Sequence, residues 1–252
     1  GGSAKQGRER KFQAILPLRG KILNVERVRL DRMLMAETVK NLILALGAGI
    51  GDSLDMKRLR YHRIVIMTDA DVDGAHIRTL LLTLMFRHFP QVIEQGYLYI
   101  AQPPLYAISK GKKTRYAYSD DDKTAILGEF LAAKKGKDAA PASAKALAGE
   151  QVQLDEEAVV ELEGEMSAAD AASTGVEKIA GVCVLRYQGV GEMNATQLWE
   201  STMDPARRIL YQVTLEDAIA ADQIFTILMS EGVEARREYI EQHALEVTNL
   251  DV

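Results

Sequence analysis

Short apolar runs alternate with amphipathic stretches in the first hundred residues, a pattern typical of an α/β protein. Runs rich in β-branched, aliphatic or aromatic residues predict strands at residues 12–18, 63–68 and 97–101. Helical apolar spacing predicts helices at residues 31–46 and 74–89. Because the run at 63–68 is apolar almost throughout, it is typical of a strand buried on both faces. We therefore expect a mostly parallel sheet flanked by helices.

The middle of the chain changes character twice. Two alternating segments, 105–109 and 115–119, flank a basic glycine-containing turn and predict a hairpin. Residues 131–174 are rich in Ala, Lys, Glu, Gly and Ser and almost lack aromatic residues. Such a composition cannot bury much apolar surface and is typical of an insertion or linker.

Helical signals dominate the last seventy residues. Asn194 and Gln197 have the spacing of an N-cap pair, and so do Thr214 and Asp217 at the start of a second helix. A last amphipathic helix is expected over residues 233–247. The sequence thus predicts three regions: a globular domain at 1–119, an insertion or linker at 120–181, and a mostly helical tail at 182–252.

Composition and charge narrow the class of protein. The chain has 252 residues, 47% hydrophobic and 27% charged, which is ordinary for a globular protein. The lack of an apolar run of about 20 residues or of a signal segment argues against a membrane or secreted protein. The single cysteine, Cys183, excludes an internal disulfide and a cysteine-based zinc site, so we expect a cytoplasmic setting.

Positive charge is concentrated at the start of the chain. The net charge is −5, but residues 1–40 carry ten Lys and Arg against four Asp and Glu. Two interpretations remain open from charge alone: a solvated basic face, or a surface that meets an anionic partner such as a nucleic-acid backbone.

Three aspartates at alternate positions, Asp69, Asp71 and Asp73, follow the predicted strand at 63–68. The stretch DADVDG matches the opening of an EF-hand loop, but the twelfth position, where that loop needs a bidentate carboxylate, is Leu80, and a strand precedes it instead of a helix. A phosphohydrolase of the haloacid-dehalogenase type is a second interpretation, because in that class an aspartate at the end of a strand is the nucleophile and a second aspartate follows two residues later. The later lysine and acidic motifs of that class have no clear counterparts here.

A magnesium site for nucleic-acid chemistry is the interpretation that we favour for the three aspartates. Carboxylate oxygens are the ligands that Mg²⁺ prefers, and ligands bind α/β sheets at the carboxyl ends of the strands. Capping of the next helix, with Asp73 ahead of GAHI, explains one aspartate but not three. Clustered like charges repel one another unless a cation offsets them.

Three blocks carry a family resemblance: PLRGKILNVER at 17–27, TDADVDGAHIRTLLLTLMFR at 68–87 and RYQGVGEMNATQLWESTMDP at 186–205. Together and in this order they resemble the B subunits of bacterial DNA gyrase, which are type IIA topoisomerases, over the TOPRIM domain and the carboxyl-terminal tail. The third block departs from the usual Lys-Gly-Leu-Gly at Gln188 and Val190. The resemblance implies a Rossmann-like TOPRIM fold with a helical tail.

The resemblance also implies roles for individual residues. Asp69 and Asp71 match the magnesium ligands of the family, with Asp73 nearby as a third carboxylate; Mn²⁺ or Ca²⁺ are possible substitutes. Residues that match DNA-contacting positions, or are plausible further phosphate contacts, are Lys21, Asn24, Lys5, Arg8 and Arg19. The catalytic glutamate of the family is expected upstream of Gly1, and ATP is expected to bind in an N-terminal domain outside this sequence.

The implied activity is reversible DNA cleavage by a tyrosine of the gyrase A subunit in an A2B2 assembly, supported by Mg²⁺ and coupled to ATP-driven supercoiling in the cytoplasmic nucleoid. The family is also the target of fluoroquinolone drugs. Three hypotheses follow: one half of a composite active site that turns over nothing alone, a non-catalytic module that docks the A subunit and DNA, or an independent phosphatase. The B subunit of topoisomerase IV is the alternative within the family.

Overall fold

A computed structural model gives the structure of the chain and describes residues 1–18, 22–135, 176–216 and 218–246. The chain forms two compact units, one made of residues 1–102 and 189–252 and the other of residues 103–188. These units group the residues differently from the three regions expected from the sequence. Each unit is described separately below.

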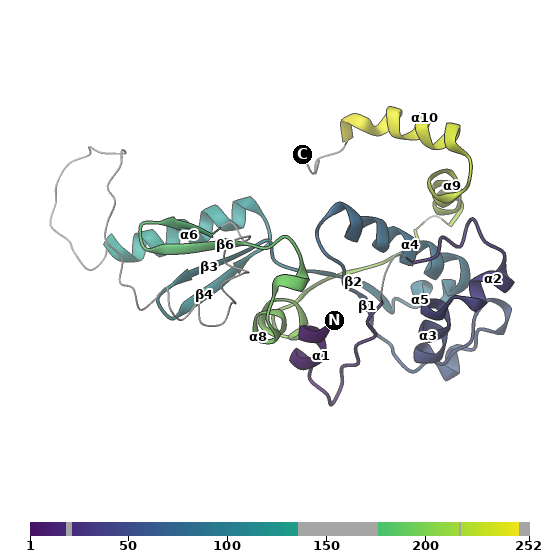
Figure 1. Cartoon of the computed structure of the whole chain (residues 1–252), viewed down its shortest axis with the longest axis horizontal. Helices are drawn as coiled ribbons and strands as arrows, with labels where there is room; N and C mark the ends of the chain where they lie inside the picture. Colours follow the sequence, from purple (N-terminus) through teal and green to yellow (C-terminus); the bar gives the residue numbers. More distant parts are fainter. Residues whose placement is uncertain (19–21, 136–175, 217, 247–252) are drawn as a thin grey trace. The chain divides into compact units, whose positions relative to one another are not determined.

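A three-stranded sheet forms the centre of the first unit. Its strands are β1 (Ile64–Ile66), β2 (Leu98–Gln102) and β7 (Ile209–Gln212), in the order β1-β2-β7 (Figure 1). β1 and β2 are parallel, whereas β2 and β7 are antiparallel. The predicted strands at 63–68 and 97–101 are therefore confirmed in their place. The sheet is mixed instead of mostly parallel, because the tail contributes a strand that runs the other way.

Helix α4 (Val72–His88) connects β1 to the next part of the unit and supplies much of its core. Its side chains Leu80, Leu84 and Met85 are almost fully buried. The predicted helix at 74–89 is confirmed. An acidic first turn and a basic last turn, which ends with Arg87 and His88, match the dipole of the helix.

The helix predicted at 31–46 is divided into α2 (Leu30–Met35) and α3 (Glu37–Leu46). Ala36 ends the first helix and begins the second, with an extended backbone (φ −66°, ψ 123°). Met33 and Val39, one in each helix, are both buried. In one continuous helix they would lie roughly 120° apart around the axis. The break lets both reach the core.

Residues 12–18 do not form the predicted strand. Phe12 is 60% exposed, and Pro17 removes a backbone donor from the segment. Gln13 is held instead by a side-chain hydrogen bond, from Nε2 to the carbonyl of Met203 at 2.8 Å. An apolar run forms a strand only where a neighbouring strand pairs with it.

The remaining helices of this unit are short, apart from the two in the tail. They are α1 (Gly2–Gly7), η1 (Gly51–Ser53), η2 (Met56–Arg58), α5 (Pro90–Glu94), η3 (Val190–Glu192), α8 (Ala195–Leu198), the π-helical turn η4 (Trp199–Met203) and η5 (Ala244–Glu246). The predicted cap of α8 is confirmed, since Asn194 Oδ1 accepts from the backbone N–H of Gln197 and Gln197 Oε1 accepts from that of Asn194. The predicted Thr214–Asp217 pair cannot be placed, because residue 217 lies outside the described residues.

The tail helices α9 (Ala218–Met229) and α10 (Val233–His243) follow β7. Phe225 of α9 stacks on Phe86 of α4, with ring centroids 5.0 Å apart. Arg87 of α4 pairs with Asp222 of α9 and donates to Thr226 Oγ1 at 3.1 Å. An aromatic stack and an ion pair thus hold α9 against α4, as the prediction of an ordered helical tail requires.

Among its described residues, 103–135 and 176–188, the second unit has an antiparallel four-stranded sheet and the helix α6 (Asp120–Lys135). The strands are β3 (Tyr106–Lys110), β4 (Lys113–Ala117), β5 (Val176–Ile179) and β6 (Val182–Arg186), in the order β4-β3-β6-β5. Helix α6 covers one face, where Ile126 joins the core of the unit (Figure 1). The predicted hairpin at 105–119 is confirmed as β3 and β4.

Most of the low-complexity stretch, residues 136–175, lies outside the described residues. α6 and β5 fall within the range 120–181 that the sequence assigns to an insertion or linker. None of the helices in the described ranges combines the length and the apolar character that crossing a bilayer requires.

Substitutions of two leucines, one buried and one exposed, test where the core of the first unit lies. Leu84 on α4 is 1% exposed, whereas Leu44 on α3 is 71% exposed. We expect Leu84→Ala to lower the free energy of unfolding by about 2–5 kcal/mol, because it leaves a cavity. Leu44→Ala should change it by less than about 0.5 kcal/mol. Urea unfolding followed by the fluorescence of Trp199, the only tryptophan, measures both; equal losses would contradict this core assignment.

Candidate metal and nucleic-acid site

Residues 69–73, the aspartate loop, follow β1 and extend into the first turn of α4; they carry the three predicted metal ligands, and the structure gives Asp71 a defined local role. Asp71 is the N-cap of α4, and its Oδ1 accepts a hydrogen bond of 2.6 Å from the backbone N–H of Gly74. Asp73 lies in the first turn of the helix. The alternative in which Asp73 caps the helix is therefore wrong in detail: Asp71 is the cap, because α4 begins one residue after it.

Asp69 is held by a segment far away in the sequence. Its Oδ1 accepts a hydrogen bond of 2.8 Å from the backbone N–H of Val190, 121 residues later in the chain. Gly189 lies against the same carboxylate, and Gly74 lies against the backbone of Asp69. Residues of the block at 186–205 thus contact Asp69 directly.

The donor set suits a hard cation such as Mg²⁺. Asp69 and Asp71 each use one lone pair of Oδ1 for a backbone hydrogen bond, which leaves Oδ2 as the oxygen of each carboxylate with the most capacity to meet a cation. Asp69 is half-buried, and Asp71 and Asp73 are exposed. No group of three or more His, Cys, Asp or Glu side chains is arranged to hold a metal within the described residues. Mg²⁺ usually takes one or two carboxylates and completes its shell with water and phosphate, so two aspartates are sufficient protein ligands.

Two of the predicted DNA-contacting residues lie on or beside α1. Lys5 is exposed in the last turn of α1, and Arg8 donates from Nη1 to the Lys5 carbonyl at 3.0 Å. α1 packs closely on α8: a Cβ atom at Gly7 would lie 2.5 Å from the carbonyl oxygen of Ala195. Residues 189–203 therefore contact both the basic first helix and the aspartate loop. Arg19 and Lys21 lie outside the described residues.

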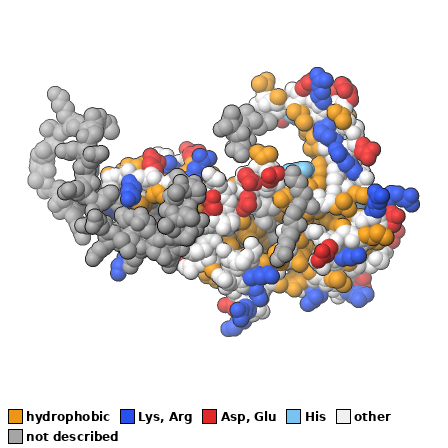
Figure 2. Space-filling view, in the orientation of Figure 1, with side chains coloured by type: hydrophobic (Ala, Val, Ile, Leu, Met, Phe, Trp, Pro, Cys, Tyr) orange, Lys and Arg blue, Asp and Glu red, His pale blue; other side chains and the backbone are white. Residues whose placement is uncertain are grey.

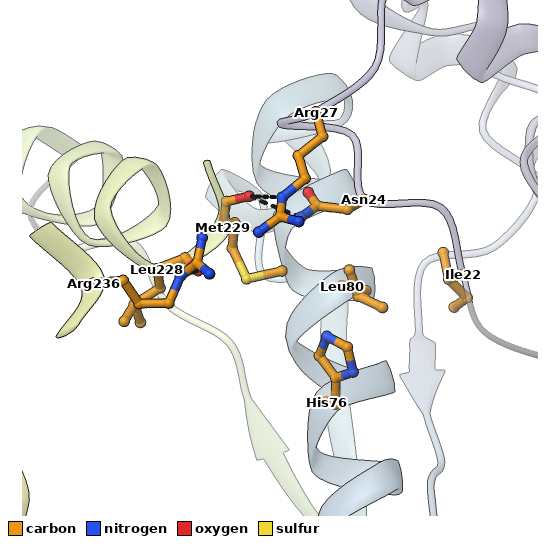
Figure 3. Close-up of a pocket in the computed structure, with 8 residues that line it drawn as sticks. All are labelled: Ile22, Asn24, Arg27, His76, Leu80, Leu228, Met229 and Arg236. Carbon is orange, nitrogen blue, oxygen red and sulfur yellow. Dashed lines mark hydrogen bonds between the residues drawn. The ribbon is translucent and has the colours of Figure 1, made fainter. Parts of the chain in front are cut away.

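The side chain of Asn24 makes two hydrogen bonds within the protein. Its Nδ2 donates to the Met229 carbonyl at 2.8 Å (Figure 3), and its Oδ1 accepts from the backbone N–H of Glu26 at 3.0 Å. Each end of the amide keeps capacity for one more hydrogen bond, since the NH₂ group has two protons and the oxygen two lone pairs. A contact with DNA would add to these bonds without requiring that they break.

Three side chains hold the carboxyl end of α9. Besides Asn24, Arg27 donates to the carbonyls of Met229 at 3.3 Å and Ser230 at 3.1 Å, and Arg236 donates to that of Leu228 at 2.7 Å. These groups border a hollow of about 440 Å³, whose lining is Ile22, Asn24, Arg27, His76, Leu80, Leu228, Met229 and Arg236 (Figure 3). Cations suit this position, because the last carbonyls of a helix carry partial negative charge.

Charges at the end of α4 affect the pKa values of two neighbours. Burial disfavours the charged form of Arg87, but hydrogen bonds to Glu26 and Asp222 outweigh it and raise the pKa of the guanidinium. For His88, burial and the positive charge of Arg87 lower the pKa below its usual value, against a smaller opposing effect of Glu26. The folded chain therefore favours a neutral His88.

Sequence reasoning missed the residues that support the aspartate loop. Gly74, Gly189 and Val190 contact it through backbone atoms or through the lack of a side chain. No charge or functional group marked them in the sequence. An available signal was the pair of glycines in GVG, which three residues separate from the apolar run at 182–185.

A pH dependence follows from the lowered pKa of His88. The unfolded chain binds a proton at His88 near pH 6.5, whereas the folded chain binds it only at lower pH. The stabilising contribution is therefore present above about pH 6.5 and is lost as the pH falls below it. In thermal unfolding from pH 7.5 to 5.5, His88→Gln should lose less stability than the parent chain. The exposed His62→Gln is the control; if both variants follow the parent slope, His88 plays no such role.

Two family models match the chain, and the residues that they match include those of the candidate site. The Toprim domain matches residues 1–103, which include the aspartate loop, and the carboxyl terminus of the DNA gyrase B subunit matches residues 180–241. The matched tail includes Gly189 and Val190, the residues that contact Asp69.

Curated relatives align with the whole chain. The DNA gyrase B subunit of Halalkalibacterium halodurans is 48% identical over 252 residues, that of Archaeoglobus fulgidus 49% and that of Thermotoga maritima 47%. Each alignment covers 100% of this chain and 32% of the relative, so the chain spans about a third of their length. The chain is thus similar to DNA gyrase B subunits over its whole length, with a match to the Toprim domain and a match to the carboxyl terminus of that subunit.

Proposed function

We propose that the chain is the metal- and DNA-binding part of a type IIA topoisomerase. In this proposal it supports Mg²⁺-dependent cleavage and religation of double-stranded DNA by a tyrosine of the gyrase A subunit, within an A2B2 assembly that supercoils DNA in the cytoplasm. The observation that carries the proposal is the placement of Asp69 and Asp71 at the carboxyl end of β1, each with one oxygen fixed by a backbone N–H.

Asp69 and Asp71 would hold the magnesium ion, with Asp73 as a nearby third carboxylate. When bound, Mg²⁺ supplies positive charge that stabilises the charge developing on the phosphate and the leaving 3′ oxygen. The two carboxylates keep their positions because Val190 and Gly74 donate to them. A ligand that is already oriented loses less free energy on binding the ion.

DNA would contact the basic residues of the same unit. Lys5 and Arg8 are candidates for contacts with phosphate, and Asn24 can add one hydrogen bond to the two it makes. Lys21 and Arg19 remain proposed contacts from the resemblance. Contacts of this kind fix the position of the backbone near the metal site and carry no sequence preference of their own.

ATP hydrolysis and the nucleophilic tyrosine are assigned in this proposal to parts outside the 252 residues. We therefore expect the chain alone to turn over nothing. A docking module for the A subunit is the second candidate. It is favoured by exposed apolar side chains among charged ones on α9, α10 and the turn η5 that follows them (Figure 2): Ile219, Ile224, Val233, Ile240 and Leu245.

Asparagine variants separate these two candidates. In the full-length B subunit, combined with an A subunit and supercoiled plasmid, Asp69→Asn and Asp71→Asn should lower Mg²⁺-dependent cleavage about 100-fold or more. The reason is that metal ligation contributes several kcal/mol to the transition state, and about 1.4 kcal/mol corresponds to tenfold. Asparagine keeps an oxygen that can accept from Val190 or cap α4, so the fold is retained.

Asp52→Asn is the matched control, because Asp52 is an exposed aspartate in η1, outside the loop. It should cleave like the parent. If the loop variants cleave like the parent and only weaken assembly with the A subunit, the chain is a docking module. If the isolated chain hydrolyses a simple phosphomonoester, the phosphatase hypothesis replaces both.

A further inference from the structure

The carboxylate of Asp69 has a close neighbour on the side of the tail. A Cβ atom at Gly189 would lie 2.7 Å from both Cγ and Oδ1 of Asp69, a separation at which one of the two must move. One residue later, the N–H of Val190 donates to the same Oδ1 at 2.8 Å. Contact and hydrogen bond together fix where this oxygen lies.

The backbone of Asp69 is fixed from the other side by α4. A Cβ at Gly74 would lie 2.2 Å from the carbonyl oxygen of Asp69. Gly74 also donates to Asp71. Two glycines, one at the start of α4 and one ahead of η3, therefore enclose Asp69 on its backbone and on its side chain.

The conformation of Gly189 does not itself require glycine. Its φ of −163° and ψ of 167° are extended values that any residue adopts. The reason for a glycine here is the space taken by Asp69. Gly191, two residues later, has open space where a Cβ would be. The same GVG stretch thus holds one glycine against the carboxylate and one away from it.

We propose that Gly189 and Val190 are positioning residues for Asp69: the N–H of Val190 fixes Oδ1, and the missing side chain of Gly189 lets the carboxylate keep the rotamer that presents Oδ2 to a divalent cation. The inference rests on the proposed function, which makes Asp69 a ligand. Hydrogen bonds that orient metal ligands typically change metal affinity or activity by 10–100-fold when they are lost.

Three single variants test the two parts of this inference in the full-length B subunit. Gly189→Ala adds the Cβ that meets Asp69, and Gly191→Ala adds the same atom where there is space. Val190→Pro removes the N–H donor. Proline suits this position, because Val190 is the first residue of η3 and the residue before it is extended.

The first readout is the binding of Mn²⁺ to the free B subunit, followed by electron paramagnetic resonance of the unbound ion. The second is the Mg²⁺ concentration that gives half-maximal plasmid cleavage with the A subunit. We expect Gly189→Ala and Val190→Pro to weaken Mn²⁺ binding and to raise the Mg²⁺ requirement, each by about 10–100-fold. Gly191→Ala should stay within about twofold of the parent.

A double variant controls for a general loss of folding. Gly189→Ala should lower the thermal unfolding midpoint of the B subunit clearly, but much less when Asp69→Ala has removed Cγ and Oδ1, the two atoms at 2.7 Å, and left only the Cβ at 3.1 Å. If the midpoint falls equally in both backgrounds, Gly189 acts on the loop in general and the inference is wrong.

Two further outcomes are distinguishable. If Gly189→Ala and Val190→Pro bind Mn²⁺ like the parent while Asp69→Asn abolishes cleavage, the inference fails and the proposed function stands. If Asp69→Asn cleaves like the parent, the proposed function fails. The inference then fails too, because Asp69 is not a metal ligand that needs to be positioned.

Discussion

The crowding of negative charge at the end of β1 is the constraint on which the arrangement of the first unit depends. Three aspartates within five residues repel one another, and backbone N–H groups offset this repulsion at two of them. The donor for Asp71 is local, because α4 begins there. The donor for Asp69 comes from Val190, so the aspartate loop reaches its observed form only when the tail segment is in place.

The same tail segment connects several parts of the unit. After η3 contacts Asp69, α8 packs on α1, and β7 then adds an antiparallel strand to β2. Farther on, α9 packs on α4 through Phe225, and its last carbonyls are held by Asn24 and Arg27. The tail is therefore part of the fold that carries the candidate site. This agrees with the two separate family matches, to the Toprim domain at residues 1–103 and to the carboxyl terminus of the DNA gyrase B subunit at residues 180–241.

Local features of the chain were predictable where the signal was itself local. The strand at β1, helix α4 and the Asn194 cap follow from apolar periodicity and capping chemistry. The break at Ala36 was not predictable, because it depends on Met33 and Val39 both reaching one core. Residues 12–18 carry a strand-like pattern without a partner strand. The role of Gly189 was hidden for a similar reason, since a glycine shows its function only when the atom it makes room for is known.

We propose that Asp69 and Asp71, oriented by backbone donors, form the protein side of a divalent-cation site for DNA cleavage. Anomalous diffraction from crystals of the B subunit with an A subunit, DNA and Mn²⁺ tests it most directly. We predict an anomalous peak at bonding distance from oxygens of Asp69 and Asp71, with the Val190 N–H still donating to Asp69. A well-occupied Mn²⁺ peak at the cleaved phosphate that touches neither aspartate would contradict it.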